Sequence, residues 1–217
     1  MMQTIHRFIL SIRERRAYVT TFLVVINVVV FLLMELTGNR ESGLFLLQWG
    51  AGYPPAIDAG QYWRLFTLTF LHGDMEHLIN NMLLLYLLGD NLERALGSVG
   101  YAFLYVTAGV SASAISWQMQ RIVGTQHLTL GASGAIFGVL GALLAILIIH
   151  KGHLEGLSLK RLGVMVALSL YSGFTSVGID NSAHVGGLVS GFIIAFVLYG
   201  IKRIELRKER EHTKYED

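Results

Sequence analysis

Two residues of this chain have the side chains that nucleophilic cleavage of an amide requires. Ser133 lies in a Gly-Ala-Ser-Gly motif (131–134), and His184 lies in an Ala-His-Val-Gly-Gly motif (183–187). A serine hydroxyl is a weak nucleophile until a base accepts its proton, and histidine, whose pKa is near neutrality, suits that role. Ser133 is therefore a candidate nucleophile, and His184 is its candidate general base.

Cleavage also needs hydrogen-bond donors for the oxyanion that forms. His77 and Asn81 are four residues apart, so they share one face of a helix and offer two side-chain donors. A serine at a helix N-terminus lies beside free backbone N–H groups. The backbone of Ser133 and these two side chains form the candidate oxyanion site. Asp180 precedes His184 by four residues, but we expect it at the membrane edge, which leaves a third triad member open.

The elements that carry these residues are long and almost free of charge. The chain has 217 residues, of which 53% are apolar and 15% charged, and its mean hydropathy is +0.53. A membrane helix needs about 20 mostly apolar residues. The charge-free runs predict an all-α, polytopic membrane protein with six membrane helices, at about 18–37, 75–93, 97–119, 132–149, 159–177 and 181–201.

The basic residues predict the orientation of these helices. On this topology, 14 of the 17 lysines and arginines lie on the side that holds both termini, which the positive-inside rule makes cytoplasmic. The second, fourth and sixth helices then start near the outer face, so their polar residues share one depth. We divide the chain into a basic N-terminus (1–17), a six-helix domain (18–203) and a charged tail (204–217).

Small residues predict how the helices that carry Ser133 and His184 meet. Ala183, Gly187 and Gly191 repeat every four residues, and Gly134 and Gly138 do the same. Such faces let membrane helices approach closely. If the two faces meet, Ser133 and His184 lie at the same end of the contact. The first external loop, about residues 38–62, is long, and its aromatic residues suit the headgroup layer.

These residues resemble the rhomboid family of intramembrane serine proteases. The resemblance runs from Trp63-Arg64 through His72 and the family's His-x-x-x-Asn (77–81) to the Gly-Ala-Ser-Gly motif and the Ala-His-x-x-Gly-x-x-x-Gly motif (183–191). It implies a Ser133–His184 dyad without an acidic third member. It also implies an oxyanion site formed by the backbone N–H of Ser133 with the side chains of His77 and Asn81.

The resemblance assigns further residues supporting roles. It makes His72 a structural neighbour of the site and Arg64 an organiser of the first loop. The other supporting residues are Trp63, Gly131, Gly134, Phe137, Gly187 and Gly191. Phe137 stands where some family members have a tyrosine packed on the catalytic histidine, so the ring contact is kept and the hydroxyl is lost.

The resemblance also implies a substrate and a location. The expected reaction is cleavage of a peptide bond in or beside the membrane segment of a single-pass protein, with access between the second and fifth helices. No cofactor or metal is expected. We expect an integral protein of a bacterial cell membrane, with the lipid bilayer and its substrates as partners and the site near the outer face.

Three alternatives compete with this hypothesis. A metal-dependent hydrolase could use the histidines together with Glu76, although the His-Glu-x-x-His spacing is absent. A catalytically inactive rhomboid-like protein could bind or escort membrane proteins. A transporter would need paired charges in the middle of the bilayer. Nucleic acid is not an expected partner, because the net charge is only +2, and the absence of cysteine excludes a thiol nucleophile.

Overall fold

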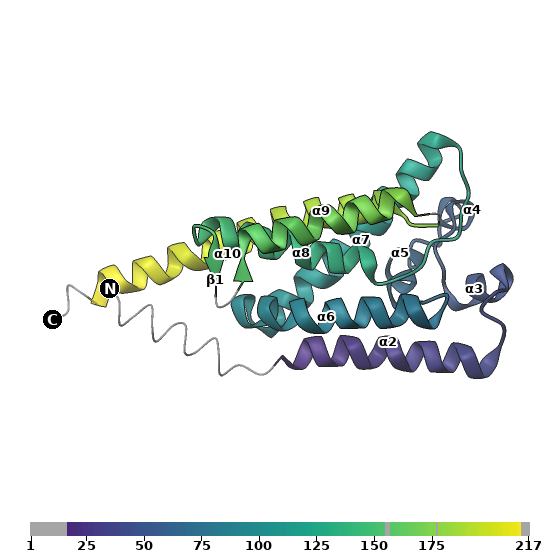
Figure 1. Cartoon of the computed structure of the whole chain (residues 1–217), viewed down its shortest axis with the longest axis horizontal. Helices are drawn as coiled ribbons and strands as arrows, with labels where there is room; N and C mark the ends of the chain where they lie inside the picture. Colours follow the sequence, from purple (N-terminus) through teal and green to yellow (C-terminus); the bar gives the residue numbers. More distant parts are fainter. Residues whose placement is uncertain (1–16, 155–156, 177, 214–217) are drawn as a thin grey trace.

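The computed structural model describes residues 17–154, 157–176 and 178–213, with backbone alone for 153–154 and 202–213. Six long helices form a bundle in which they run side by side along the longest axis of the molecule (Figure 1). They are α2 (Tyr18–Thr37), α6 (Met75–Leu96), α7 (Ser98–Val123), α8 (Ser133–Ile149), α9 (Leu159–Thr175) and α10 (Asn181–Thr213). Each begins within one residue of its predicted start, so the all-α fold is confirmed. The predicted N-terminal segment 1–16 and residues 214–217 lie outside the described residues.

Three of the helices are long and apolar enough to cross a membrane: α2, α7 and the first part of α10, Asn181–Ile201. Helix α8 is apolar too, but it has only 17 residues. The prediction of six spans therefore stays a prediction. Helix α10 continues to Thr213, past its predicted end near residue 201, because the lysines, arginines and glutamates that follow are good helix formers.

The segment between α2 and α6, which includes the long first loop, contains helices that periodicity did not reveal. They are α3 (Gly43–Trp49), α4 (Pro54–Asp58), α5 (Arg64–Thr67) and the 3-10 helix η1 (Leu68–Phe70). Ser42 caps α3 by accepting a hydrogen bond from the backbone of Phe45, and Gly50 ends it in the left-handed conformation. These short helices gather at one end of the bundle, away from the C-terminal end of α10 (Figure 1). At the opposite end, β1 (His153–Leu154) and β2 (Leu157–Ser158) form a small antiparallel hairpin between α8 and α9.

Helix α8 is the centre of the bundle, and it packs most extensively on α10. Thirteen of its 17 residues are buried. A methyl group at Gly187 would overlap the carbonyl oxygen of Gly134, and one at Gly191 would overlap that of Gly138. The two small-residue faces therefore meet backbone to backbone, as the sequence predicts.

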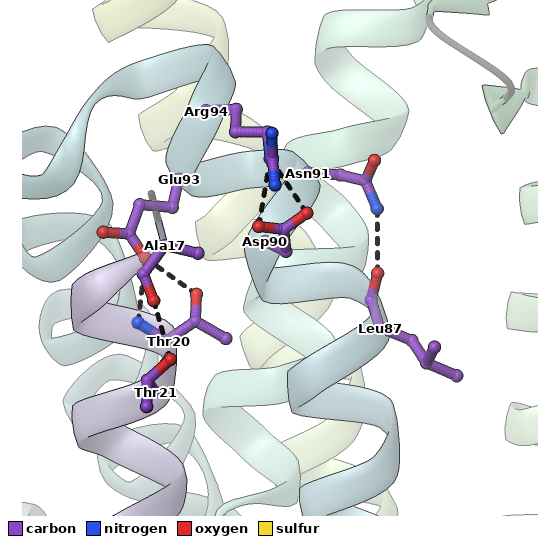
Figure 2. Close-up of polar contacts among 8 residues, drawn as sticks. All are labelled: Ala17, Thr20, Thr21, Leu87, Asp90, Asn91, Glu93 and Arg94. Carbon is purple, nitrogen blue, oxygen red and sulfur yellow. Dashed lines mark hydrogen bonds and ion pairs between the residues drawn. The ribbon is translucent and has the colours of Figure 1, made fainter. Parts of the chain in front are cut away.

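One buried carboxylate, near the C-terminal end of α6, holds this helix against α2. Glu93 reaches from α6 to the first turn of α2, where its side chain accepts a hydrogen bond from the backbone N–H of Thr20 at 2.8 Å (Figure 2). It also accepts one from the backbone N–H of Val19 at 3.0 Å. The hydroxyls of Thr20 and Ser98 donate to it as well, at 2.9 and 2.7 Å. Both oxygens of Glu93 thus have two donors, and the carboxylate caps the N-terminus of α2.

Candidate active site

Ser133 is the first residue of α8, at the end of a segment that the first loop holds in place. Upstream, Gly52 and Thr129 exchange two backbone hydrogen bonds of 2.9 Å, and the N–H of Gly131 donates to the carbonyl of Leu68 at 2.9 Å. Gly131 has a φ of 124°, which a residue with a side chain rarely adopts. The turn therefore requires glycine, and it presents Ser133 with the free N–H groups of the helix N-terminus.

His184 lies in the first turns of α10 and is buried, with 8% of its surface exposed. Its ring stacks on Phe137, with the centroids 4.2 Å apart and the planes 14° from parallel. Phe137 is one turn after Ser133, so the imidazole lies against the side of α8 that carries the serine. The structure records no hydrogen bond between the Ser133 hydroxyl and His184 among the described residues. It places the two at the same end of the α8–α10 contact.

His77 and Asn81 border the same turn from α6. A side-chain carbon at Gly131 would lie 2.8 Å from both Cε1 and Nε2 of His77, and 3.8 Å from Nδ2 of Asn81. Asp74 caps α6 and accepts a hydrogen bond from the backbone N–H of His77 at 2.7 Å. The two predicted oxyanion donors are thus brought to the turn that precedes Ser133.

His72 supports Asn81 from the loop before α6. It is fully buried, and its Nε2 lies 3.0 Å from Nδ2 of Asn81. Burial lowers the pKa of His72 to about 3, so the imidazole is neutral at physiological pH. A neutral Nε2 can accept a hydrogen bond from the Asn81 amide, which fixes that amide and leaves its second N–H free to donate elsewhere.

Arg64 ties the first loop together, as the resemblance implies. Its guanidinium donates to the carbonyls of Leu47 and Ala51 at 2.8 and 2.9 Å and to the side chain of Gln61 at 2.7 Å. It also lies over the ring of Trp63, 4.5 Å from the centroid. Burial lowers the pKa of Arg64 from its usual value, but a guanidinium stays protonated in proteins.

A small polar cavity that the sequence analysis did not anticipate lies behind Ser133. Its volume is about 30 Å³, enough for one water molecule, and Ser113, Ser116 and Asp180 are among its lining residues. Ser116 donates a short hydrogen bond to Asp180, whose other oxygen accepts from the backbone N–H of Ala183 at 3.0 Å. The signal in the sequence was the serines within the charge-free run 95–120.

The metal alternative has no observation in its favour. In the part of the chain that the structure describes, no three histidine, aspartate or glutamate side chains come together as a metal ion requires. His72 and His77 are near neighbours, with ring centroids 5.0 Å apart, but Asn81 takes up one nitrogen of His72.

The chain matches the Rhomboid domain over residues 59–201, a stretch that contains every candidate site residue. The chain belongs to the rhomboid family. It is 34% identical over 179 residues to the rhomboid protease GluP of Bacillus subtilis, an alignment that covers 82% of this chain and 34% of GluP. It is 32% identical over 201 residues to the rhomboid protease AarA of Providencia stuartii, covering 81% of this chain and 70% of AarA.

Rhomboid relatives also occur in plants. RHOMBOID-like protein 5 of Arabidopsis thaliana is 38% identical over 144 residues, covering 65% of this chain and 46% of the relative. The chain thus spans about a third of the length of GluP and a little under half of the length of this plant protein. Family membership and the apolar helices make the protein an integral, multi-pass membrane protein. Its bacterial origin and its orientation stay predictions.

Proposed function

We propose that this rhomboid is an intramembrane serine protease in which Ser133 is the nucleophile and His184 is the general base. The observation that carries the proposal is the meeting of three elements at one turn. Helix α8 begins at Ser133, α10 brings His184 onto the ring of Phe137, and α6 brings His77 and Asn81 against Gly131.

The proposed reaction has two halves. The Ser133 oxygen attacks the carbonyl carbon of the scissile peptide bond while His184 takes the hydroxyl proton. The negative charge moves to the carbonyl oxygen, where the backbone N–H of Ser133 and the side chains of His77 and Asn81 stabilise it. His184 then gives its proton to the leaving amine, and the C–N bond breaks. In the second half, a water molecule attacks the acyl-enzyme ester in the same way and releases the carboxylic acid.

The proposed substrate is a single-pass membrane protein cut in or beside its membrane segment. A helical carbonyl is already hydrogen-bonded, so the scissile bond must leave its helix before Ser133 can reach it. Access between α6 and α9 is supported by the loose packing of α9, in which only Leu162, Val166 and Gly173 are buried. The chain has no cysteine, so one cysteine introduced into each helix tests this route. Closing that cross-link should stop cleavage of membrane substrates, and unchanged turnover would reject the route.

The activity is tested with purified protein in liposomes that contain a single-pass model substrate. Wild type should cut the substrate and react with a fluorophosphonate at Ser133. Ser133→Ala and His184→Ala should lower cleavage by at least about 10³-fold. Ser190→Ala is the matched control, because its hydroxyl bonds only to the backbone carbonyls of Gly186 and Gly187. Cleavage by either site variant at the wild-type rate would remove that residue from the mechanism. A folded wild type that binds membrane proteins without cutting them would favour the inactive rhomboid-like alternative.

A further inference from the structure

Two buried polar atoms at the start of α10 have no hydrogen-bond partner. They are Nδ1 of His184 and Oδ1 of Asn181. Both face the same point on α9, because a side-chain carbon at Gly173 would lie 2.5 Å from Oδ1 of Asn181 and 3.6 Å from Nδ1 of His184. Buried polar atoms nearly always have a hydrogen-bond partner, so two unpaired atoms that face the same point on α9 need a physical explanation.

The orientation of the Asn181 amide is determined by its other end. Its Nδ2 donates to the carbonyl oxygen of Gly173 at 3.1 Å. A carbonyl oxygen can only accept a hydrogen bond, so the NH₂ group of Asn181 must face the carbonyl oxygen of Gly173. The amide oxygen of Asn181 must then face the point on α9 that it shares with His184. The unpaired atom of Asn181 is therefore an acceptor.

The two atoms are close enough to be connected. Their distances from the Gly173 position place them within about 6 Å of each other, a gap that one bridging water can span. They are three residues apart on one helix, so they are neighbours on its surface. A methyl group at Gly173 would press on the amide oxygen of Asn181, so this position needs glycine.

We propose that Asn181 is a positioning residue for His184. Its Oδ1 accepts a hydrogen bond from one water molecule beside Gly173, and that water accepts the Nδ1–H of the imidazole. This bond selects the tautomer in which Nε2 has a free lone pair, which is the form that can take a proton from Ser133. The inference rests on the proposed function, because it gives His184 the role of general base. A neutral amide suits the site, since a carboxylate there would have to be buried beside apolar helices.

Asp180 does not fill this role, although it is the acid directly before the same helix. Its oxygens are taken by the hydroxyl of Ser116 and the backbone N–H of Ala183. The groups whose charges act on His184 are Asp180 just before α10 and His77 on α6. Asp180 thus caps α10 and ties it to α7, while Asn181 points its free oxygen toward the imidazole.

The first test reads the tautomer of His184 in the wild-type protein. The full chain is labelled with ¹⁵N-histidine in detergent, and the ring signals of His184 are assigned by their loss in His184→Gln. The expected spectrum at neutral pH has a protonated Nδ1 and an unprotonated Nε2. A proton on Nε2 in the wild type would overturn the proposal, and this result does not depend on activity.

The second test compares variants of Asn181 in the liposome assay. Asn181→Leu removes the acceptor, so kcat should fall by about 10–100-fold with KM nearly unchanged, as for other partners that orient a histidine. Its His184 spectrum should become a mixture of tautomers. Asn181→Asp keeps an acceptor, so it should recover much of kcat and move the activity profile to higher pH, because a carboxylate stabilises the imidazolium. Ser182→Ala, in the same turn, is the control and should match wild type.

The outcomes separate this inference from the proposed function. An unchanged kcat and tautomer in Asn181→Leu would overturn the role of Asn181, even while Ser133→Ala is inactive. A wild-type chain that neither cuts substrate nor reacts with fluorophosphonate would contradict the protease assignment, whatever the tautomer is.

Discussion

The two ends of α6 border two buried polar clusters, and the central groups of these clusters differ in how completely they are paired. At one end, the carboxylate of Glu93 accepts four hydrogen bonds from α2 and from the start of α7. At the other end, near His77, the cluster around Ser133 keeps unpaired atoms on His72, Asn181 and His184. Glu93 follows His77 by 16 positions, which separates the clusters by about 24 Å along the helix.

The difference indicates what each cluster is for. A buried carboxylate with two donors on each oxygen stabilises one arrangement of helices, whereas unpaired polar atoms in a buried site are costly and are expected where chemistry is done. Changes near Glu93 should therefore alter stability and leave the turnover of folded molecules unchanged. Changes near Ser133 should lower the turnover of folded molecules.

The largest effect is expected for Asn81→Ala. Removing one oxyanion donor should lower kcat by about 10²–10³-fold, which corresponds to about 3–4 kcal/mol. The neighbouring Asn80 is exposed, so Asn80→Ala is a matched control that should cut at nearly the wild-type rate. Cleavage kinetics in liposomes measure both variants. Equal losses in the two would show that Asn81 has no special part in the reaction.

The next effect is on stability, at the other end of the helix. Glu93→Gln keeps the shape of the side chain but turns an NH₂ group toward donors, so the free energy of unfolding should fall by about 2 kcal/mol. Thermal unfolding in detergent measures the loss, and kcat per folded molecule should not change. Glu76→Gln, an exposed carboxylate at the other end of α6, is the control. A loss of kcat at full stability would break the contrast between the clusters.

Acid should act on stability through His72. Its pKa is about 3 in the folded protein, against an ordinary value of 6.5, so below about pH 6.5 the unfolded chain binds a proton that the folded chain does not. The free energy of unfolding should therefore fall as the pH is lowered, by up to about 2 kcal/mol between pH 7 and pH 5 for this group. His72→Gln should show a weaker loss over the same range in thermal unfolding. The same acid sensitivity in both proteins would assign it to other groups.

The smallest effect is expected for Phe137→Tyr. The added hydroxyl leaves the ring stacked on His184, so kcat should change by less than about fivefold, or below about 1 kcal/mol. Phe137→Leu removes the stacked ring and should lower kcat more than the tyrosine does. If the tyrosine proved the more damaging of the two, ring contact would not be what holds His184.

The sequence predicted the long helices and most of the site, because both leave local signals. Charge-free runs marked the helix starts, and the small residues at Gly187 and Gly191 marked the face that meets α8. The helices of the first loop were missed because α3, α4 and α5 are too short for a period to show. The pairings of Asn181 with Gly173 and of Asp180 with Ser116 join different helices, so no local pattern could reveal them.

Helix α10 is continuous from Asn181 to Thr213, about 50 Å, which exceeds the hydrocarbon thickness of about 30 Å by several turns. The helix that carries His184 is therefore longer than the bilayer core, and its C-terminal part extends beyond the lipid. A twist or pull applied to that end is transmitted to the imidazole without a hinge to absorb it. A fusion partner attached after Thr213 should accordingly be joined through a flexible, glycine-rich linker, so that its motion does not exert force on α10.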